Sequence, residues 1–147
     1  MKTEIILATH PNAVRRAADV LQHGGLVAFP TDTVYGVGVP AFSESGIERL
    51  YTLKGRSTDK AIAILLAAAD DLPRVAASIS PAARALAAAF WPGPLTLVLP
   101  RRPELPQAIS PLPTVGVRVP NHPVTRALLT LVGPLAVTSA NRSGEKN

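Results

Sequence analysis

The sequence predicts a three-layer α/β domain, in which helices flank both faces of a β-sheet. Short apolar runs alternate along the chain with segments that repeat apolar residues at helical spacing. The length of 147 residues is that of one ordinary domain, and we find no internal repeat. A hydrophobic content of 47% with 17% charged residues fits a packed chain rather than a disordered one. We therefore expect a single domain over residues 1–147.

The first elements follow from apolar runs and from proline and glycine signals. Residues 5–8 form an apolar run that predicts a first strand. Pro11 is placed to open an amphipathic helix, which Gly24 ends. The short apolar run at residues 26–29 predicts a buried strand, because glycines and a proline bound it.

The next helix is predicted from its N-terminal capping signal. Ser45 followed by Glu48 matches a capping box, and a helix of apolar periodicity then runs to Gly55. Lys54 is therefore expected at a helix terminus. The later strands are predicted at residues 62–66, 95–99, 115–119 and 135–138, and further helices open at Pro81 and Pro123. Residues 100–113 hold five prolines and predict a mobile surface loop, the one candidate linker, whose flanking strands share a sheet.

Composition excludes several classes of protein. The longest apolar run, residues 61–69, is shorter than the ~18–20 residues that a membrane span needs. The N-terminus lacks the apolar stretch of a secretory signal, and the chain has no cysteine, which favours a cytoplasmic location. A net charge of +5 favours anionic partners such as nucleotides or RNA.

A polar segment at residues 30–38 follows a predicted strand directly. It combines hydroxyls, a carboxylate and glycines, which favours a ligand-binding loop over an ordinary strand-end turn. Gly36, Gly38 and Ala41 formally match a relaxed dinucleotide fingerprint, but Pro40 interrupts it and no acidic residue follows at the required distance. A Rossmann site is therefore not expected.

Basic residues give the second candidate site. Lys54, Arg56 and Lys60 surround a glycine before a predicted strand and could bind phosphate oxygens; the alternative is a solvated helix end. Arg118 lies inside a predicted strand, so it either points to solvent or occupies a site that needs a guanidinium, for example to bind a carboxylate.

The segment after the last predicted strand offers polar groups but no nucleophile. Ser139 and Asn141 could orient a ligand, or could simply cap a helix or form an Asx-turn. No G-x-S-x-G elbow surrounds Ser139, and the three histidines show no metal-ligand spacing. A hydrolase and a protein-bound metal are therefore not expected.

Five segments together resemble the YrdC/Sua5 family, the threonylcarbamoyl-AMP synthases. They are FPTDTVYGVG at 29–38, KGRSTDK at 54–60, FWPGPLTL at 90–97, VGVRVPNHP at 115–123 and TSANRSG at 138–144. The resemblance implies a YrdC/RibB-like fold, a twisted mixed sheet flanked by helices, with a positively charged cavity. It also implies an enzyme, a nucleotidyltransferase that joins L-threonine, bicarbonate and ATP into threonylcarbamoyl-AMP and pyrophosphate. This reaction is the first stage of t6A synthesis at position 37 of certain tRNAs.

The same resemblance implies a role for each matching residue. Lys54 and Arg56 would be catalytic, because they can stabilise charge on the phosphates of ATP. The implied ATP-binding residues are Lys54, Arg56, Thr58 and Asn141, and the implied threonine-binding residues are Thr31, Arg118 and Ser139. Mg²⁺ would accompany ATP, contact with tRNA would be possible, and proteins that transfer the threonylcarbamoyl group to tRNA would act downstream.

The chain departs from the family pattern in two respects. Ser57 and Ala61 stand where the family commonly has prolines, so this loop is expected to be less rigid. Family members continue well beyond the SAN motif, so a chain that stops at Asn147 is expected to be truncated. Two alternatives stay open: a non-catalytic RNA-binding domain, and a carbamoyl-transfer domain like those of hydrogenase-maturation proteins, which usually carry zinc-binding cysteines.

Overall fold

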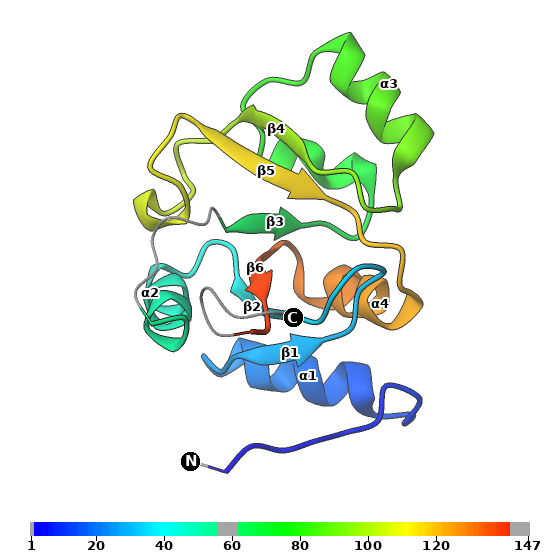
Figure 1. Ribbon diagram of the computed structural model, residues 1–147, viewed down its shortest axis with the longest axis vertical. Coiled ribbons are helices and arrows are strands. Elements are labelled where there is room, and N and C mark those ends of the chain that lie inside the picture. Colours follow the sequence, from blue (N-terminus) through cyan, green and yellow to red (C-terminus); the bar gives the residue numbers. More distant parts are fainter. Residues whose placement is uncertain (1, 56–61, 142–147) are drawn as a thin grey trace.

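One mixed β-sheet organises the computed structural model, which describes residues 2–55 and 62–141. Its strands are β1 Val27–Phe29, β2 Gly36–Pro40, β3 Ala63–Leu65, β4 Leu97–Pro100, β5 Thr114–Arg118 and β6 Leu135–Ser139. Their order in the sheet is β1-β2-β6-β3-β5-β4, which Figure 1 shows from β1 below to β4 above. β3 and β5 are parallel, and the other neighbouring strands are antiparallel. β6 therefore lies inside the sheet, between β2 and β3.

Helices cover both faces of this sheet. They are α1 Ala13–Gln22, α2 Glu44–Leu53, α3 Pro81–Phe90 and α4 Pro123–Val132, with short 3₁₀ segments η1 Ala69–Arg74 and η2 Gln107–Ile109. Buried residues of α1 and α4 form one core, and those of α2 and α3 form another. Adjacent strand residues alternate between the two cores: Ile64 faces the α2 and α3 side, whereas Leu65 faces the α1 and α4 side. The predicted three-layer α/β fold with a mixed sheet is confirmed.

The N-terminal segment is not the strand that its apolar run predicts. Figure 1 shows it running beside α1, outside the sheet. Ile5 is 89% exposed and Leu7 is 75% exposed, and an ion pair of 2.9 Å between Glu4 and Arg16 ties the segment to α1. Only Ile6 is partly covered. An apolar run becomes a strand only where its backbone pairs with a neighbouring strand, and composition alone does not determine that pairing.

Two further details near the first motif differ from the prediction. The capping box at Ser45 is wrong, because Ser43 caps α2 and its Oγ accepts a hydrogen bond of 3.1 Å from the Gly46 N–H. Ser43 has the extended backbone that an N-cap needs, and the helix begins directly after it. The segment at residues 30–38, predicted as a binding loop, is a loop only to residue 35, because β2 begins at Gly36 and pairs with β1 on one side and β6 on the other.

The proline-rich segment between β4 and β5 is more firmly held than a surface loop. Its flanking strands pair as predicted, but Leu105 and Ile109 are buried in the core. Arg101 donates hydrogen bonds to three carbonyls of this segment, at Leu105 (2.6 Å), Pro106 (2.8 Å) and Ser110 (3.1 Å).

A side chain of α2 also holds this proline-rich segment. The Tyr51 hydroxyl donates to the Ala108 carbonyl (2.7 Å), and burial raises the pKa of Tyr51. These side chains replace the backbone donors that the prolines lack, so the segment belongs to the domain.

Gly36 is required by close packing rather than by an unusual backbone angle. A Cβ at this position would lie 2.7 Å from Val137 Cγ1 and 3.3 Å from Phe29 Cε2. We expect Gly36→Ala to lower the free energy of unfolding by about 1–3 kcal/mol through overpacking, measured by urea denaturation. The cost should shrink when Val137→Ala makes room, so an equal cost in both backgrounds would contradict this packing explanation.

Candidate functional site

Lys54 joins the end of α2 to the end of β6. It is the C-cap of α2, as predicted, and only 8% exposed. Its Nζ donates to the carbonyl oxygens of Ser139 (2.9 Å) and Asn141, and to Asn141 Oδ1 (3.4 Å). A buried ammonium is stable only when oxygen acceptors replace its water shell. The solvated helix end considered for Lys54 is therefore excluded, and three of the predicted site residues lie together.

The turn that follows β6 is itself ordered by hydrogen bonds. The Ser139 hydroxyl donates to Asn141 Oδ1. The Ala140 N–H donates to the carbonyl of Tyr35 (2.9 Å), which belongs to the loop between β1 and β2. This loop, residues 30–35, therefore lies directly against the turn of residues 139–141. The amide and hydroxyl groups near Lys54 are thus ordered by contacts within the chain.

Arg118 does not point into solvent. It is the last residue of β5, and its side chain is only 12% exposed. Its Nε donates to the Gly93 carbonyl (2.9 Å) and its Nη1 to Thr33 Oγ1 (3.1 Å), while Nη2 forms an ion pair with the Asp32 carboxylate. The guanidinium thus pairs with a carboxylate of the chain itself, and its contact with a ligand carboxylate stays a prediction.

Thr31 lies in the same loop, and its hydroxyl makes hydrogen bonds within it. Thr31 Oγ1 accepts from the Thr33 N–H (3.1 Å) and donates to the Val34 carbonyl. The loop is anchored from behind by Thr125, a fully buried residue of α4 whose hydroxyl donates to the Pro30 carbonyl. Loop 30–35 therefore bridges two clusters, Arg118 on β5 and the Lys54 cluster at the end of β6.

Several predictions fall on residues that the structure does not describe. They concern Arg56, Thr58 and Lys60, together with the departures at Ser57 and Ala61. Among the described residues, no three His, Asp or Glu side chains gather closely enough to hold a metal ion. None of the described helices has the length and apolar character needed to cross a membrane.

Sequence reasoning missed three partners of Arg118: the side chains of Asp32 and Thr33, and the carbonyl of Gly93. The sequence shows the Asp32 carboxylate as one of the polar groups in the motif at residues 30–38. Its pairing with Arg118, however, joins residues 86 positions apart and depends on how β1 and β5 are placed in the sheet.

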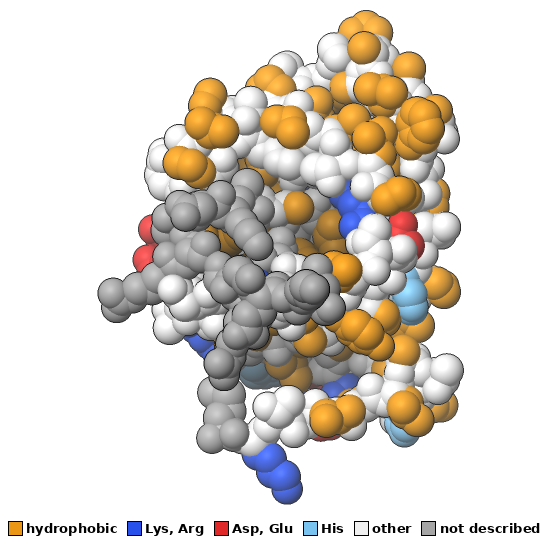
Figure 2. Space-filling view, in the orientation of Figure 1, with side chains coloured by type: hydrophobic (Ala, Val, Ile, Leu, Met, Phe, Trp, Pro, Cys, Tyr) orange, Lys and Arg blue, Asp and Glu red, His pale blue; other side chains and the backbone are white. Residues whose placement is uncertain are grey.

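The described residues of the upper part of the molecule present mainly apolar side chains (Figure 2). In Figure 2 the described residues show mainly hydrophobic side chains over the upper part of the molecule, around α3 and β4, and few Lys or Arg. Leu86, Phe90 and Val98 are exposed there, with Val98 at 66%. On this face, the described residues give little support to an extended RNA-binding stripe.

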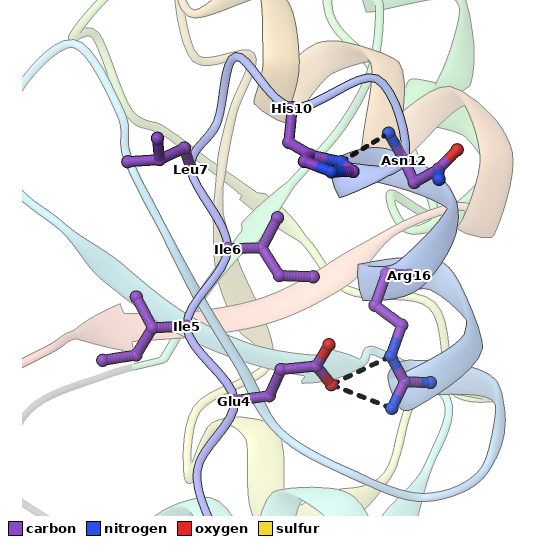
Figure 3. Close-up of a pocket in the computed structure, with 7 residues that line it drawn as sticks. All are labelled: Glu4, Ile5, Ile6, Leu7, His10, Asn12 and Arg16. Atoms are coloured by element: carbon purple, nitrogen blue, oxygen red, sulfur yellow. Dashed lines mark hydrogen bonds and ion pairs between the residues drawn. The ribbon is translucent and has the colours of Figure 1, made fainter.

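A shallow cavity of about 530 Å³ lies elsewhere, between the N-terminal segment and α1. Figure 3 shows its lining residues, in which Glu4 and Arg16 face each other and the ring of His10 accepts from the Asn12 N–H. The hydrogen bond and charge of Glu4 raise the pKa of Arg16. None of the predicted site residues lines this cavity.

The family profile for Sua5, YciO and YrdC proteins, described as "Telomere recombination", matches residues 19–147. The chain belongs to this Sua5/YciO/YrdC family. It is 44% identical over 134 residues to the threonylcarbamoyl-AMP synthase of Pyrococcus abyssi, covering 90% of this chain and 39% of that protein. It is 37% identical over 142 residues to the threonylcarbamoyl-AMP synthase of Bacillus subtilis, covering 95% of this chain and 41% of that protein.

Solved members of the Sua5/YciO/YrdC family show the same fold. The crystal structure of P. abyssi Sua5 complexed with L-threonine matches with a TM-score of 0.88 and 42% identity, covering 97% of this chain and 42% of that one. The chain therefore spans about two fifths of the length of these relatives. The family resemblance seen in the motifs is confirmed.

Proposed function

We propose that this chain carries the threonine- and ATP-handling domain of an L-threonylcarbamoyladenylate synthase. The proposal rests mainly on one observation: loop 30–35 is hydrogen-bonded both to Arg118 and to the turn that holds Lys54. With the Gly93 carbonyl that accepts from Arg118, all five motifs that resemble the family contribute to one continuous set of polar groups. Relatives with 37–44% identity that carry the synthase name support the same activity.

The proposed reaction has two steps. The amine of L-threonine first forms an N–C bond with bicarbonate, with loss of water, to give a carbamate. A carbamate oxygen then attacks the α-phosphorus of ATP in line, and the bond to pyrophosphate breaks as the new P–O bond forms. The enzyme is in this sense a nucleotidyltransferase, and its catalysis is mostly positioning and charge stabilisation.

The threonine half of the proposed site lies around Arg118. Its planar guanidinium suits the threonine carboxylate, because two parallel hydrogen bonds also fix the direction of the amine. The hydroxyls of Thr31 and Ser139 would complete the contacts. The structure supports this arrangement because loop 30–35 already places hydroxyl groups next to the guanidinium.

The ATP half lies around Lys54. Its ammonium, held by carbonyls of Ser139 and Asn141, would share its charge with a phosphate oxygen of the nucleotide. Arg56 and Thr58 would add phosphate contacts, and Asn141 would orient the nucleotide. We expect Mg²⁺ to arrive with the ATP phosphates, since the described residues offer no cluster of acidic ligands. The product would pass to tRNA-modifying proteins in the cytoplasm.

The test is adenylate formation by the purified chain. Threonylcarbamoyl-AMP, detected by mass spectrometry, and pyrophosphate should appear only when L-threonine, bicarbonate and ATP are all present. Calorimetric titration with threonine and then with ATP reports binding separately from turnover. ATP consumption that does not depend on threonine, or a chain that binds neither ligand, would contradict the proposal.

A further inference from the structure

Arg118 and Asp32 form a cation and an anion side by side in the proposed threonine site. Their side chains are 12% and 16% exposed, so both are largely shielded from water. Asp32 uses Oδ1 for the ion pair. Within the described residues, no hydrogen bond engages its second oxygen, Oδ2, which is therefore an available acceptor.

An amino acid presents the complementary pair of charges. At neutral pH threonine is a zwitterion, with a carboxylate and an ammonium on the same carbon atom. A guanidinium alone recognises only the carboxylate of threonine. A protein carboxylate next to the guanidinium can accept a charge-assisted hydrogen bond from the threonine ammonium, because the two ligand groups are attached to one carbon and lie as close together as the two protein groups.

We propose that Asp32 binds the α-ammonium group of threonine, so that Arg118 and Asp32 together form a receptor for the zwitterion. This inference rests on the proposed function, and it adds a specificity residue to it. Asp32 would orient the nitrogen, which loses one proton to solvent before it captures bicarbonate as the neutral amine. Asp32 would also discriminate amino acids from hydroxy acids of the same shape. Asp32 discriminates by its negative charge. An ammonium donates a strong hydrogen bond to the carboxylate because both groups are charged, whereas a neutral hydroxyl in the same place donates a weaker one.

The position of Asp32 is well enough held for this role. The Thr125 hydroxyl fixes the Pro30 carbonyl at the start of the loop, and the Thr33 hydroxyl accepts from Arg118 just after Asp32. Asp32 is thus restrained on both sides. An opposite reading is that Asp32 merely competes with the substrate carboxylate for Arg118. The two readings predict opposite changes in threonine affinity when the negative charge of Asp32 is removed.

The experiment compares two ligands on the full chain by calorimetry: L-threonine, and 2,3-dihydroxybutyrate of the same configuration, in which a hydroxyl replaces the amine. The wild-type chain should prefer threonine by about 10- to 100-fold, the range of one charge-assisted hydrogen bond. Asp32→Asn keeps an oxygen that can accept from Arg118 but removes the charge. It should weaken threonine binding, leave dihydroxybutyrate binding equal or tighter, and so abolish most of the preference.

Asp71→Asn is the matched control, because it removes the same carboxylate charge from an ion pair with Arg74 (3.9 Å) that lies in η1 rather than in loop 30–35. It should retain the preference for threonine. The proposal is overturned if Asp32→Asn keeps the preference, tightens both ligands, or weakens both equally. A wild-type chain that binds both ligands alike overturns it without any variant, whereas a wild-type chain that binds no threonine shows that the proposed function itself has failed.

Discussion

Replacing Lys54 by alanine is expected to lower the rate of threonylcarbamoyl-AMP formation by about 10²- to 10³-fold, as is common when one preorganised charge-stabilising group is lost. The structure adds a second reason. Lys54 Nζ donates to the Ser139 and Asn141 carbonyls, so the variant also leaves these acceptors without their cation. We expect the decrease in rate to appear in kcat, which is measured as pyrophosphate release at saturating threonine. The melting temperature of the variant should also be lower than that of the wild type.

The control for Lys54 is another cation of the same helix. Arg49 lies in α2, and its guanidinium donates to the Gly24 carbonyl, away from the Ser139–Asn141 turn. Arg49→Ala should leave kcat within about threefold of wild type, because a single exposed polar contact is worth little. A near-native rate for Lys54→Ala would remove Lys54 from the mechanism.

Replacing Arg118 by lysine should weaken L-threonine binding by about 10- to 100-fold and leave ATP binding nearly unchanged. Lysine keeps the positive charge but cannot reproduce a planar group that donates to Gly93, Thr33 and Asp32 at once. The loss corresponds to about 1.5–3 kcal/mol, the value of one hydrogen bond to a charged group. Calorimetric titration with each ligand measures both affinities.

Arg126→Lys provides the comparison for this substitution. Arg126 of α4 also donates a guanidinium hydrogen bond to a backbone carbonyl, but this acceptor is Ala67 (3.1 Å) and not a group of loop 30–35. Threonine affinity should be unchanged in this variant. If Arg118→Lys bound threonine as tightly as the wild type does, the carboxylate would have to be held by other groups.

Most of the elements could be predicted because local signals determine them. Pro81 and Pro123 open helices α3 and α4, and apolar runs mark β3 and β6. The failures have a common physical cause, which is dependence on distant partners. The run at residues 5–8 has the composition of a strand but pairs with no described strand, although β1 lies at the edge of the sheet. β2 contains glycines, and its formation depends on pairing with β1 and β6, which the local sequence does not reveal.

The candidate site was predictable as a set of residue types but not as a set of contacts. Lys54, Ser139 and Asn141 were each expected to bind ligand, and the structure shows that they also bind one another. Asp32 received no role of its own, since its partner Arg118 lies on a strand far along the chain. Whether Arg56 and Thr58 join the Lys54 cluster stays a prediction, because both lie outside the described residues.

The central place of β6 has a consequence for how the protein is made. β6 is the last of the described strands in the sequence, yet it separates β2 from β3 in the sheet. Until residues up to 139 have left the ribosome, β2 and β3 lack the strand that pairs with both of them, and any sheet formed earlier has an exposed edge there. Such non-local pairing slows folding and leaves partly made chains prone to aggregation. We therefore expect the ligand-binding clusters to form late and together, when β6 docks, rather than one after another as the chain emerges.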